Sequence, residues 1–327
     1  MAKATRALAI TVALLTTAFG CLAAERTYPC FRAQTSPVLD GDIAGDAAWR
    51  SMPVATGFSV LGGDHTVAKQ TAVQACWDQE ALYVGVTCEE PDIAHMKLQV
   101  RDGGPGWLDD GIELFLQPPG GKVYQFITTA GAARTAWEGA ADGFGYEAAA
   151  SKSADGYCLE MRFPFALLEA RPQEGDRWQG NFCRNIFTRN SGGDQFTTWA
   201  PATRQFLEPE SFGTIELLGA PPSAAEAPAL SDRINAPYRQ HLLAGLAQIA
   251  AEAEQYVPVL QEATRSQRFR GQAARLRAQW RRLQQALDDA DAASTQELRG
   301  MLRGADAMLQ ASYDVKWAYM IAELFDD

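Results

Sequence analysis

The spacing of apolar residues changes once along this chain of 327 residues, near Gly219. From about Pro37 to Leu218, short segments alternate apolar and polar residues and are separated by Gly, Asp, Pro and Asn, as in antiparallel β structure. After Gly219 the apolar residues recur every three or four positions, as they do along amphipathic helices. The chain is therefore predicted to fold into a β-domain followed by a separate helical domain.

Seven or more strands are expected in the first part, with no helical pattern between them. Thr71–Trp77 and Ala81–Cys88 flank a three-residue polar turn, which predicts a hairpin. The other expected strands are Gly111–Gln117, Lys122–Thr129, Tyr157–Phe163, Arg177–Phe187 and Phe212–Leu217. This pattern favours one antiparallel β-sandwich, in residues 25–219, over a parallel α/β sheet.

A Pro- and Ala-rich linker is expected over residues 220–228, and three helices forming a small bundle over residues 229–327. Pro258 separates the first two helices, and Ser294 with Glu297 forms a capping box that opens the third. The middle helix carries Arg265, Arg268, Arg270, Arg275, Arg277, Arg281 and Arg282. Pairing with acidic residues of the neighbouring helices explains these arginines without a partner, and a patch that binds an anionic glycan or a membrane surface is the alternative. Self-association through the C-terminal helices is a further possible partner interaction.

The first 24 residues have the layout of a secretory signal peptide. Lys3 and Arg6 precede the uncharged apolar segment Ala7–Phe19, and small residues follow it. Export to the periplasm, the cell surface or the medium is expected, with lipid attachment at Cys21 as an alternative. No later segment is long and apolar enough to span a bilayer.

The mature chain is expected to be strongly acidic. The net charge is −11, and removal of Lys3 and Arg6 makes it −13, a balance that disfavours nucleic acid as a partner. The cysteines that remain are Cys30, Cys76, Cys88, Cys158 and Cys183. Because their number is odd, at least one thiol stays unpaired, and no pair has the spacing of zinc ligands.

The segment from Trp107 to Leu116 brings an indole and an acidic turn up to a strand. Alternation places Ile112 and Leu114 on one face of this strand and Glu113 on the other. A carboxylate beside an indole can hold a hydroxylated ring, whereas the plainer interpretation is that Trp107 packs in a core and Glu113 is solvated.

Several fragments occur in an order that resembles the family 9 carbohydrate-binding modules of secreted xylanases and related glycoside hydrolases, which have a DOMON-like sandwich. The fragments are Pro37-Val38-Leu39-Asp40-Gly41, Ala48-Trp49, Trp77-Asp78, Leu82-Tyr83-Val84, Trp107 with Asp110 and Glu113, Asp155-Gly156 with Glu160, Pro164-Phe165, Asn181-Phe182 with Arg184, Trp199, and Pro209 with Phe212-Gly213. The resemblance covers residues 30–218 and none of the helical part. It implies a jelly-roll-like sandwich that binds polysaccharide ends and soluble oligosaccharides between two aromatic side chains.

The resemblance assigns three sugar-binding residues. The first clamp aromatic falls on Trp107, the second on Phe206, where the family has tryptophan, and the acidic hydroxyl acceptor on Glu113. An arginine that contacts sugar in the family is replaced here by Ile127. The family binds calcium structurally, and Asp40, Asp42 and Asp46 are the candidate ligands, although their spacing is not that of an EF-hand.

Two further side chains have plainer interpretations. Arg184 lies in phase with the apolar residues of its strand and is expected to pair with a buried carboxylate such as Asp110 or Glu160. Trp49 and Trp199 are expected in the core.

Three other functions stay open beside a non-catalytic sugar binder. A glycosidase acting in carbohydrate catabolism needs paired carboxylates, which Asp109, Asp110, Glu113 and Glu160 could supply. A haem domain could use His65, His95 and Met96, although no attachment motif is present. The third is a structural or assembly protein with a degenerate sugar site.

Overall fold

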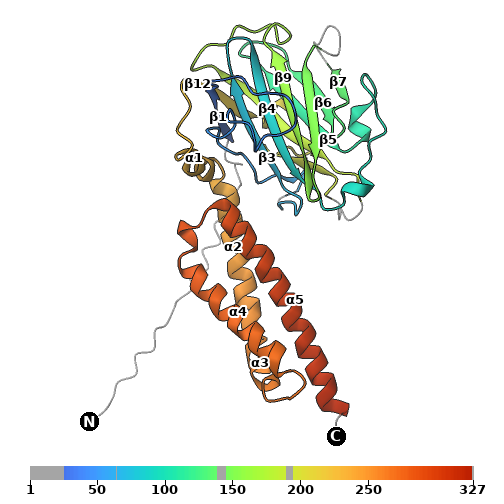
Figure 1. Ribbon diagram of the computed structural model, residues 1–327, viewed down its shortest axis with the longest axis vertical. Helices are drawn as coiled ribbons and strands as arrows, with labels where there is room; N and C mark the ends of the chain where they lie inside the picture. The colour runs from blue at the N-terminus through green and yellow to red at the C-terminus, as the bar shows by residue number, and fades with distance from the viewer. Residues whose placement is uncertain (1–25, 64, 138–144, 189–193, 326–327) are drawn as a thin grey trace, which may run out of the picture.

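The computed structural model describes residues 26–63, 65–137, 145–188 and 194–325. Figure 1 shows a β-domain at one end and a rod of helices at the other. The strands are β1 (Thr27–Arg32), β2 (Ser59–Val60), β3 (Thr71–Trp77), β4 (Ala81–Glu89), β5 (Gly111–Gln117), β6 (Tyr124–Thr129), β7 (Arg134–Trp137), β8 (Glu147–Lys152), β9 (Gly156–Pro164), β10 (Arg177–Asn185), β11 (Phe196–Thr198) and β12 (Gly213–Leu218). The expected signal peptide, residues 1–24, with Cys21 lies outside the described residues.

One continuous sheet forms the β-domain, in the order β7-β6-β5-β10-β12-β1-β3-β4-β9-β8, with β11 paired to β10 and β2 paired to β11. The two halves of this sheet fold over one another and share a single core, so the expected sandwich followed by helices is confirmed. One local exception is β1, which pairs parallel with both β12 and β3. This strand precedes Pro37, where the alternating pattern was expected to begin.

The two faces of β5 have different surroundings, as its alternation predicts. Ile112 and Leu114 point into the core between the half-sheets, where Phe182 of β10 also lies. Phe115 points to the outer face, where a loop packs Phe206 against it.

Five helices follow the sheet where three were expected, and they are α1 (Ala227–Ile234), α2 (Ala236–Glu254), α3 (Val257–Ala263), α4 (Arg270–Asp288) and α5 (Thr295–Phe325). Pro237, in the first turn of α2, splits the first expected helix into α1 and α2, and Pro258, expected to separate two helices, lies in the first turn of the additional short helix α3. In a first turn the missing N–H of proline costs nothing. The expected capping box opens α5: Ser294 Oγ and the Ser294 backbone N–H both donate to Glu297 at 2.7 Å.

Several contacts join the helices to the β-domain. Asn235, which is 2% exposed between α1 and α2, accepts a hydrogen bond from Thr56 N at 2.9 Å and donates one to Val54 O at 2.8 Å. Arg299 of α5 pairs with Glu89 of β4 at 2.6 Å. Helix α1 also begins inside the expected linker, residues 220–228, so the independence of residues 25–219 and 229–327 stays a prediction.

Arg184 is fully buried, but its carboxylate partner differs from those expected. Its guanidinium lies 3.6 Å from the buried Glu90 and donates to three backbone carbonyls. Asp110 instead accepts two backbone N–H groups, and Glu160 holds the Trp49 indole at 2.7 Å. Trp49 and Trp199 are buried as expected.

The arginines at residues 265–282 do not pair as expected. The helical ion pairs in the described part of the chain use Arg239, Arg299 and Arg303, and no carboxylate lies within 4.0 Å of the seven arginines. The five cysteines after residue 25 are all free. Across the described residues, no helix has the length and apolar character needed to cross a membrane.

Candidate functional site

The outer face of β6, β5, β10 and β11 carries the sugar-site candidates. Strand register places Ile127, Glu113, Cys183 and Thr198 side by side in one row across these four strands. Since directly paired residues of antiparallel strands point to the same face, all four share the face opposite the core. In the adjacent row, Asn185 lies opposite Phe196.

Glu113 is the buried acceptor at the centre of this face. It is 5% exposed, and each carboxylate oxygen accepts one hydrogen bond at 2.7 Å, from Asn185 Nδ2 and from Gln125 Nε2. Burial raises the pKa of the Glu113 carboxyl above its ordinary value, although both amide bonds oppose the rise. The two amides fix the orientation of the carboxylate and leave each oxygen a second lone pair for another donor.

Asn185 extends the polar centre of the face. Its side chain is 1% exposed, and while Nδ2 donates to Glu113, Oδ1 is buried without a hydrogen-bond partner. An unsatisfied buried acceptor costs stability, and such groups in folded proteins often face a ligand site. In the sequence, Asn185 is marked only by its in-phase position two residues after Cys183.

Trp107 lies in the short helix η2 (Gly106–Leu108) and is 40% exposed. Gly106 packs so closely that an added Cβ would lie 2.9 Å from Ile127 Cγ2 and 3.0 Å from Thr135 Oγ1. Ile127 is therefore a buried apolar support beneath the Trp107 turn.

Asp109 and Asp110, which follow the Trp107 turn, accept hydrogen bonds from backbone N–H groups of other segments. Asp109 accepts a hydrogen bond from Val100 N at 2.6 Å, and Asp110 accepts from Lys97 N and Phe187 N. Both carboxylates are fully buried. A cavity of about 360 Å³ adjoins this turn, and it is lined by Lys97, Gln99, Val100, Arg101, Asp102, Gly104, Pro105, Leu108 and Asp109.

Phe206 lies on the same outer face but is largely covered. It is 8% exposed and packs in a small cluster with Phe115, Cys183 and Phe212. Phe196, which the sequence interpretation did not single out, is 40% exposed and meets the Phe206 ring edge-on at 6.1 Å. Phe196 was missed because its strand has only three residues and no alternating pattern to reveal its face.

Glu208 holds the loop that carries Phe206. Its carboxylate accepts backbone hydrogen bonds from Thr203 and Arg204 at 2.7 and 2.9 Å and pairs with the Arg204 guanidinium at 2.9 Å. These bonds, led by the one from Thr203 N, lower the pKa of Glu208 to about 2. The carboxylate is therefore ionised in the folded protein at neutral pH.

The calcium candidates form backbone caps in one turn. Asp40 Oδ1 accepts from Asp42 N, Asp42 Oδ1 accepts from Gly45 N, and Asp46 accepts from both Val38 N and Ala48 N. No three His, Cys, Asp or Glu side chains of the described residues come together to hold a metal ion. The carboxylates of Asp40, Asp42 and Asp46 thus bind backbone N–H groups of their own turn, and calcium binding there stays a prediction.

The carboxylates of the glycosidase alternative do not flank a common cleft. Asp109 and Asp110 are buried and bind backbone, while Glu160 lies on β9, in the other half of the sheet from Glu113. The haem candidates have separate partners: His65 meets Asp194 at 3.3 Å, and His95 pairs with Asp92.

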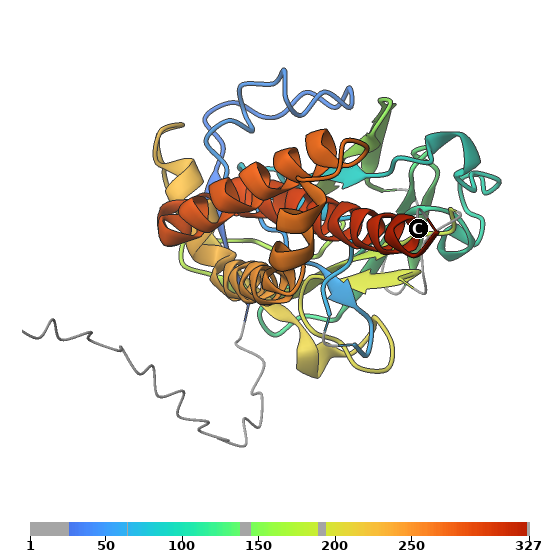
Figure 2. The same ribbon diagram turned by 90° about the horizontal axis from the view of Figure 1, so that it is seen from below.

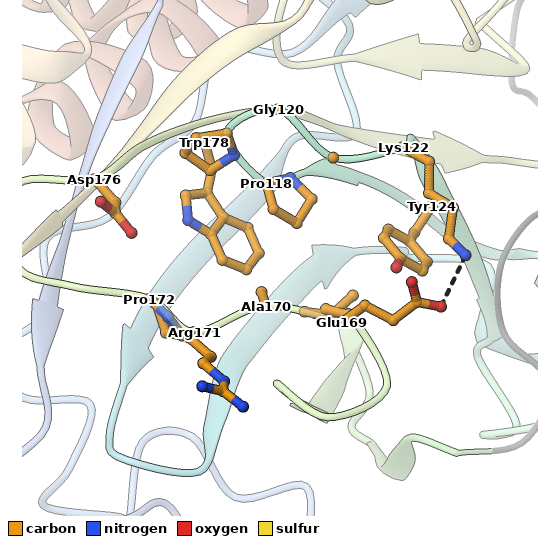
Figure 3. Close-up of a pocket in the computed structure, with 13 residues that line it drawn as sticks. Pro118, Gly120, Lys122, Tyr124, Glu169, Ala170, Arg171, Pro172, Asp176 and Trp178 are labelled. Atoms are coloured by element: carbon orange, nitrogen blue, oxygen red, sulfur yellow. Dashed lines mark hydrogen bonds and ion pairs between the residues drawn. The ribbon is translucent and has the colours of Figure 1, made fainter.

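A second cavity, of about 460 Å³, lies at the other end of β5 and β10 from Glu113 (Figure 3). Trp178, Tyr124, Pro118 and Pro172 line it, and an ion pair of 2.9 Å joins Lys122 to Glu169. Its aromatic residues belong to the central core, so this cavity opens between the half-sheets and not on the face of Glu113.

Residues 39–220, more than half of the chain, match the protein family described as "Carbohydrate family 9 binding domain-like". The chain belongs to this family. The match confirms the resemblance and identifies the β-domain as a carbohydrate-binding module of family 9, a class of binding and not of catalytic domains. The helical part lies outside the match.

Solved structures similar to this family 9 protein include two complexes of a family 9 module from Caldicellulosiruptor kristjanssonii. The cellotriose complex is 19% identical with a TM-score of 0.47, covering 59% of this chain and 94% of that one. The glucose complex is 20% identical with a TM-score of 0.46, covering 58% and 96%. A putative carbohydrate-binding protein from Bacteroides uniformis is 14% identical with a TM-score of 0.48, covering 59% and 100%. No curated protein matches the chain.

Proposed function

We propose that the outer face of β6, β5, β10 and β11 binds a terminal sugar ring of a polysaccharide or soluble oligosaccharide. Trp107 flanks the ring on one side, Phe196 backed by Phe206 flanks it on the other, and Glu113 accepts hydroxyl hydrogen bonds between them. The observation that carries this proposal is the buried Glu113 carboxylate, held by two amides on a face that also exposes two aromatic side chains.

The width of the face suits a single ring. Phe196 lies on β11, and the Trp107 turn packs over β6, three strand spacings away. Three spacings amount to about 14 Å between backbones, and the two aromatic side chains project into that span. A sugar ring between them buries its apolar C–H surface on both faces.

The polar groups at the centre of this face are hydrogen-bond acceptors, so they favour a ligand that brings donors. Both free lone pairs of the Glu113 carboxylate and the unpartnered Asn185 Oδ1 accept hydrogen bonds, which hydroxyl groups supply. The carboxylate adds charge-assisted bonds, which are the stronger kind, and so fixes the orientation of the ring. Because Ile127 supplies no cation, we expect modest affinity, about −4 to −6 kcal/mol.

Calorimetric titration of the full chain with cello- and xylo-oligosaccharides tests the proposal. Glu113→Gln keeps the shape of the side chain but removes its charge. One of the two carboxylate oxygens becomes an NH2 group, so the N–H of either Asn185 or Gln125 then faces another donor. We expect affinity to fall by roughly 10- to 100-fold, the difference between charged and neutral hydrogen bonds at two positions. The matched control Glu169→Gln, an exposed acid at the other end of the β-domain, should bind normally.

Two outcomes would count against the proposal. Unchanged binding in Glu113→Gln would place the sugar elsewhere, with the 460 Å³ cavity as the next place to examine. Absence of binding to every glycan would favour the structural or assembly role.

We also propose that the protein is exported. Either the chain is cleaved after residue 24 or a lipid is attached at Cys21, and mass spectrometry of the mature N-terminus distinguishes the two.

A further inference from the structure

The end of α5 exposes large apolar side chains that the helical bundle does not use. They are Tyr313, Trp317, Met320, Ile321, Leu324 and Phe325, each between 39% and 81% exposed. We call these six residues the C-terminal strip. Monomeric soluble proteins seldom expose so many large apolar side chains together, and such a patch usually marks an interaction surface.

The C-terminal strip forms a second apolar face on a helix that already has one. At 100° per residue, its six residues fall within an arc of about 140°. Ser312 and Val315, which are buried in the bundle, and Tyr319, which packs edge-on against Phe269 at 5.8 Å, lie on the opposite side. The bundle therefore accounts for one face of α5 and leaves the strip unpartnered.

We propose that the C-terminal strip binds the same strip of a second copy of this chain, in antiparallel orientation. Tyr313, Trp317, Met320 and Leu324 are spaced four, three and four residues apart, which is the seam of a two-heptad coiled coil. In the antiparallel register, Trp317 packs against Met320 of the second copy and Tyr313 packs against Leu324 of the second copy.

The charges beside the strip favour this partner and this orientation. Lys316 and Glu323 flank the same edge, seven residues apart, and neither joins an ion pair within the described part of the chain. Lys316 Nζ lies 5.5 Å from the centre of the Trp317 ring, at the border of the strip. Antiparallel pairing brings Lys316 of each copy to Glu323 of the other, twice by symmetry, whereas parallel pairing leaves these charges one heptad apart.

An anionic membrane fits this surface less well. Residues 304–325 contain Asp306, Asp314 and Glu323 against the single cation Lys316, so the end of α5 is acidic. Helices that bind anionic lipid carry basic residues beside their apolar face.

The position of the strip leaves room for the second copy. Figure 1 shows α5 running to the end of the molecule farthest from the β-domain, and Figure 2, seen from below, shows its last turns nearest the viewer, in front of the other elements. With 31 residues, α5 is about 46 Å long. Two strips can therefore meet while both β-domains lie away from the contact.

Sedimentation equilibrium of the full chain tests the association. We expect dimers at about 100 µM, and monomers at the same concentration for the double variant Trp317→Glu/Ile321→Glu. Ala307→Glu is the matched control, because Ala307 is exposed on the same helix two turns before the strip, and it should remain dimeric. Circular dichroism melting identifies any variant that fails to fold.

Charge reversal tests the orientation. Lys316→Glu and Glu323→Lys should each raise the dimer dissociation constant about fivefold, and their combination should restore it. A monomeric wild type, or a dimer that tolerates the Trp317→Glu/Ile321→Glu change, overturns the proposal. A double charge variant as weak as the single ones overturns the antiparallel register. A monomer that floats with phosphatidylcholine vesicles through the strip would replace the second copy by a membrane.

Discussion

Replacing the aromatic side chains on the outer face of β6, β5, β10 and β11 one at a time should separate those that stack on the sugar from those that pack inside the protein. Trp107 is 40% exposed, and a tryptophan side chain offers about 250 Å², so about 100 Å² is available to a sugar. At about 25 cal/mol per Å², complete coverage contributes about 2.5 kcal/mol. A ring that covers half of this area contributes about 1.2 kcal/mol, so Trp107→Ala should weaken binding by roughly 8- to 70-fold.

The two phenylalanines should behave differently from one another. Phe196 is also 40% exposed, and about 80 Å² of its surface predicts a loss near 2 kcal/mol for Phe196→Ala. Phe206 is 8% exposed, so its direct contribution to stacking is only about 0.4 kcal/mol. Phe206→Ala should instead destabilise the fold by about 3–5 kcal/mol and lower the melting temperature by roughly 10 °C.

Calorimetry with a cello-oligosaccharide and thermal melting of the same samples measure both effects. Trp317→Ala is the matched control, because Trp317 is 44% exposed but lies on α5, and it should leave sugar affinity unchanged. If Phe206→Ala abolished binding at an unchanged melting temperature while Phe196→Ala bound normally, the assignment of stacking to Phe196 would be refuted. Unchanged affinity in Trp107→Ala would refute the site itself.

Three more predictions follow from the same geometry. The pKa of Glu208 is lowered from 4.5 to about 2, so its contribution to stability is complete above pH 4.5 and is lost as pH falls toward 2; Glu208→Gln should flatten this part of a melting-temperature profile. Gly106→Val should displace the Trp107 turn from β6 and weaken sugar binding about as much as Trp107→Ala, and because Gly106 is buried against Ile127 and Thr135, it should also lower the melting temperature. Residues 25–219 expressed alone should unfold cooperatively as a β-domain, and a failure to do so would show that the helices are required.

Local sequence patterns correctly predicted the elements whose own residues favour the secondary structure that they adopt. The hairpin of β3 and β4 and the limits of β5 were confirmed because strict alternation and turn residues are local signals. Strand β8 was missed because three of its six residues, Ala148, Ala149 and Ala150, favour helix, and only pairing with β9 makes the segment a strand. The split of the first expected helix was missed because Pro237 fits a helix start as well as an ending.

The candidate site, too, could be predicted only where local sequence determines the position of a side chain. Alternation correctly placed Glu113 on the face opposite Ile112, and the family motif located the loop of Phe206. The burial of Phe206 could not be predicted, since it depends on Phe115 and Phe212, which reach it from other strands and loops. The partner of Arg184 was likewise set by a distant element, the end of β4.

The place of β1 in the sheet has a consequence for how the β-domain forms. This strand comes from the beginning of the described chain, yet it lies between β3 and β12, and β12 ends at Leu218. The sheet therefore cannot join its two halves until the whole segment up to Leu218 has left the ribosome. Contacts of such long sequence separation slow folding and keep unpaired strand edges open while the chain is incomplete. A version cut at residue 39, where the family match begins, would lack the strand that joins the two halves, and would present the edges of β3 and β12 to other chains.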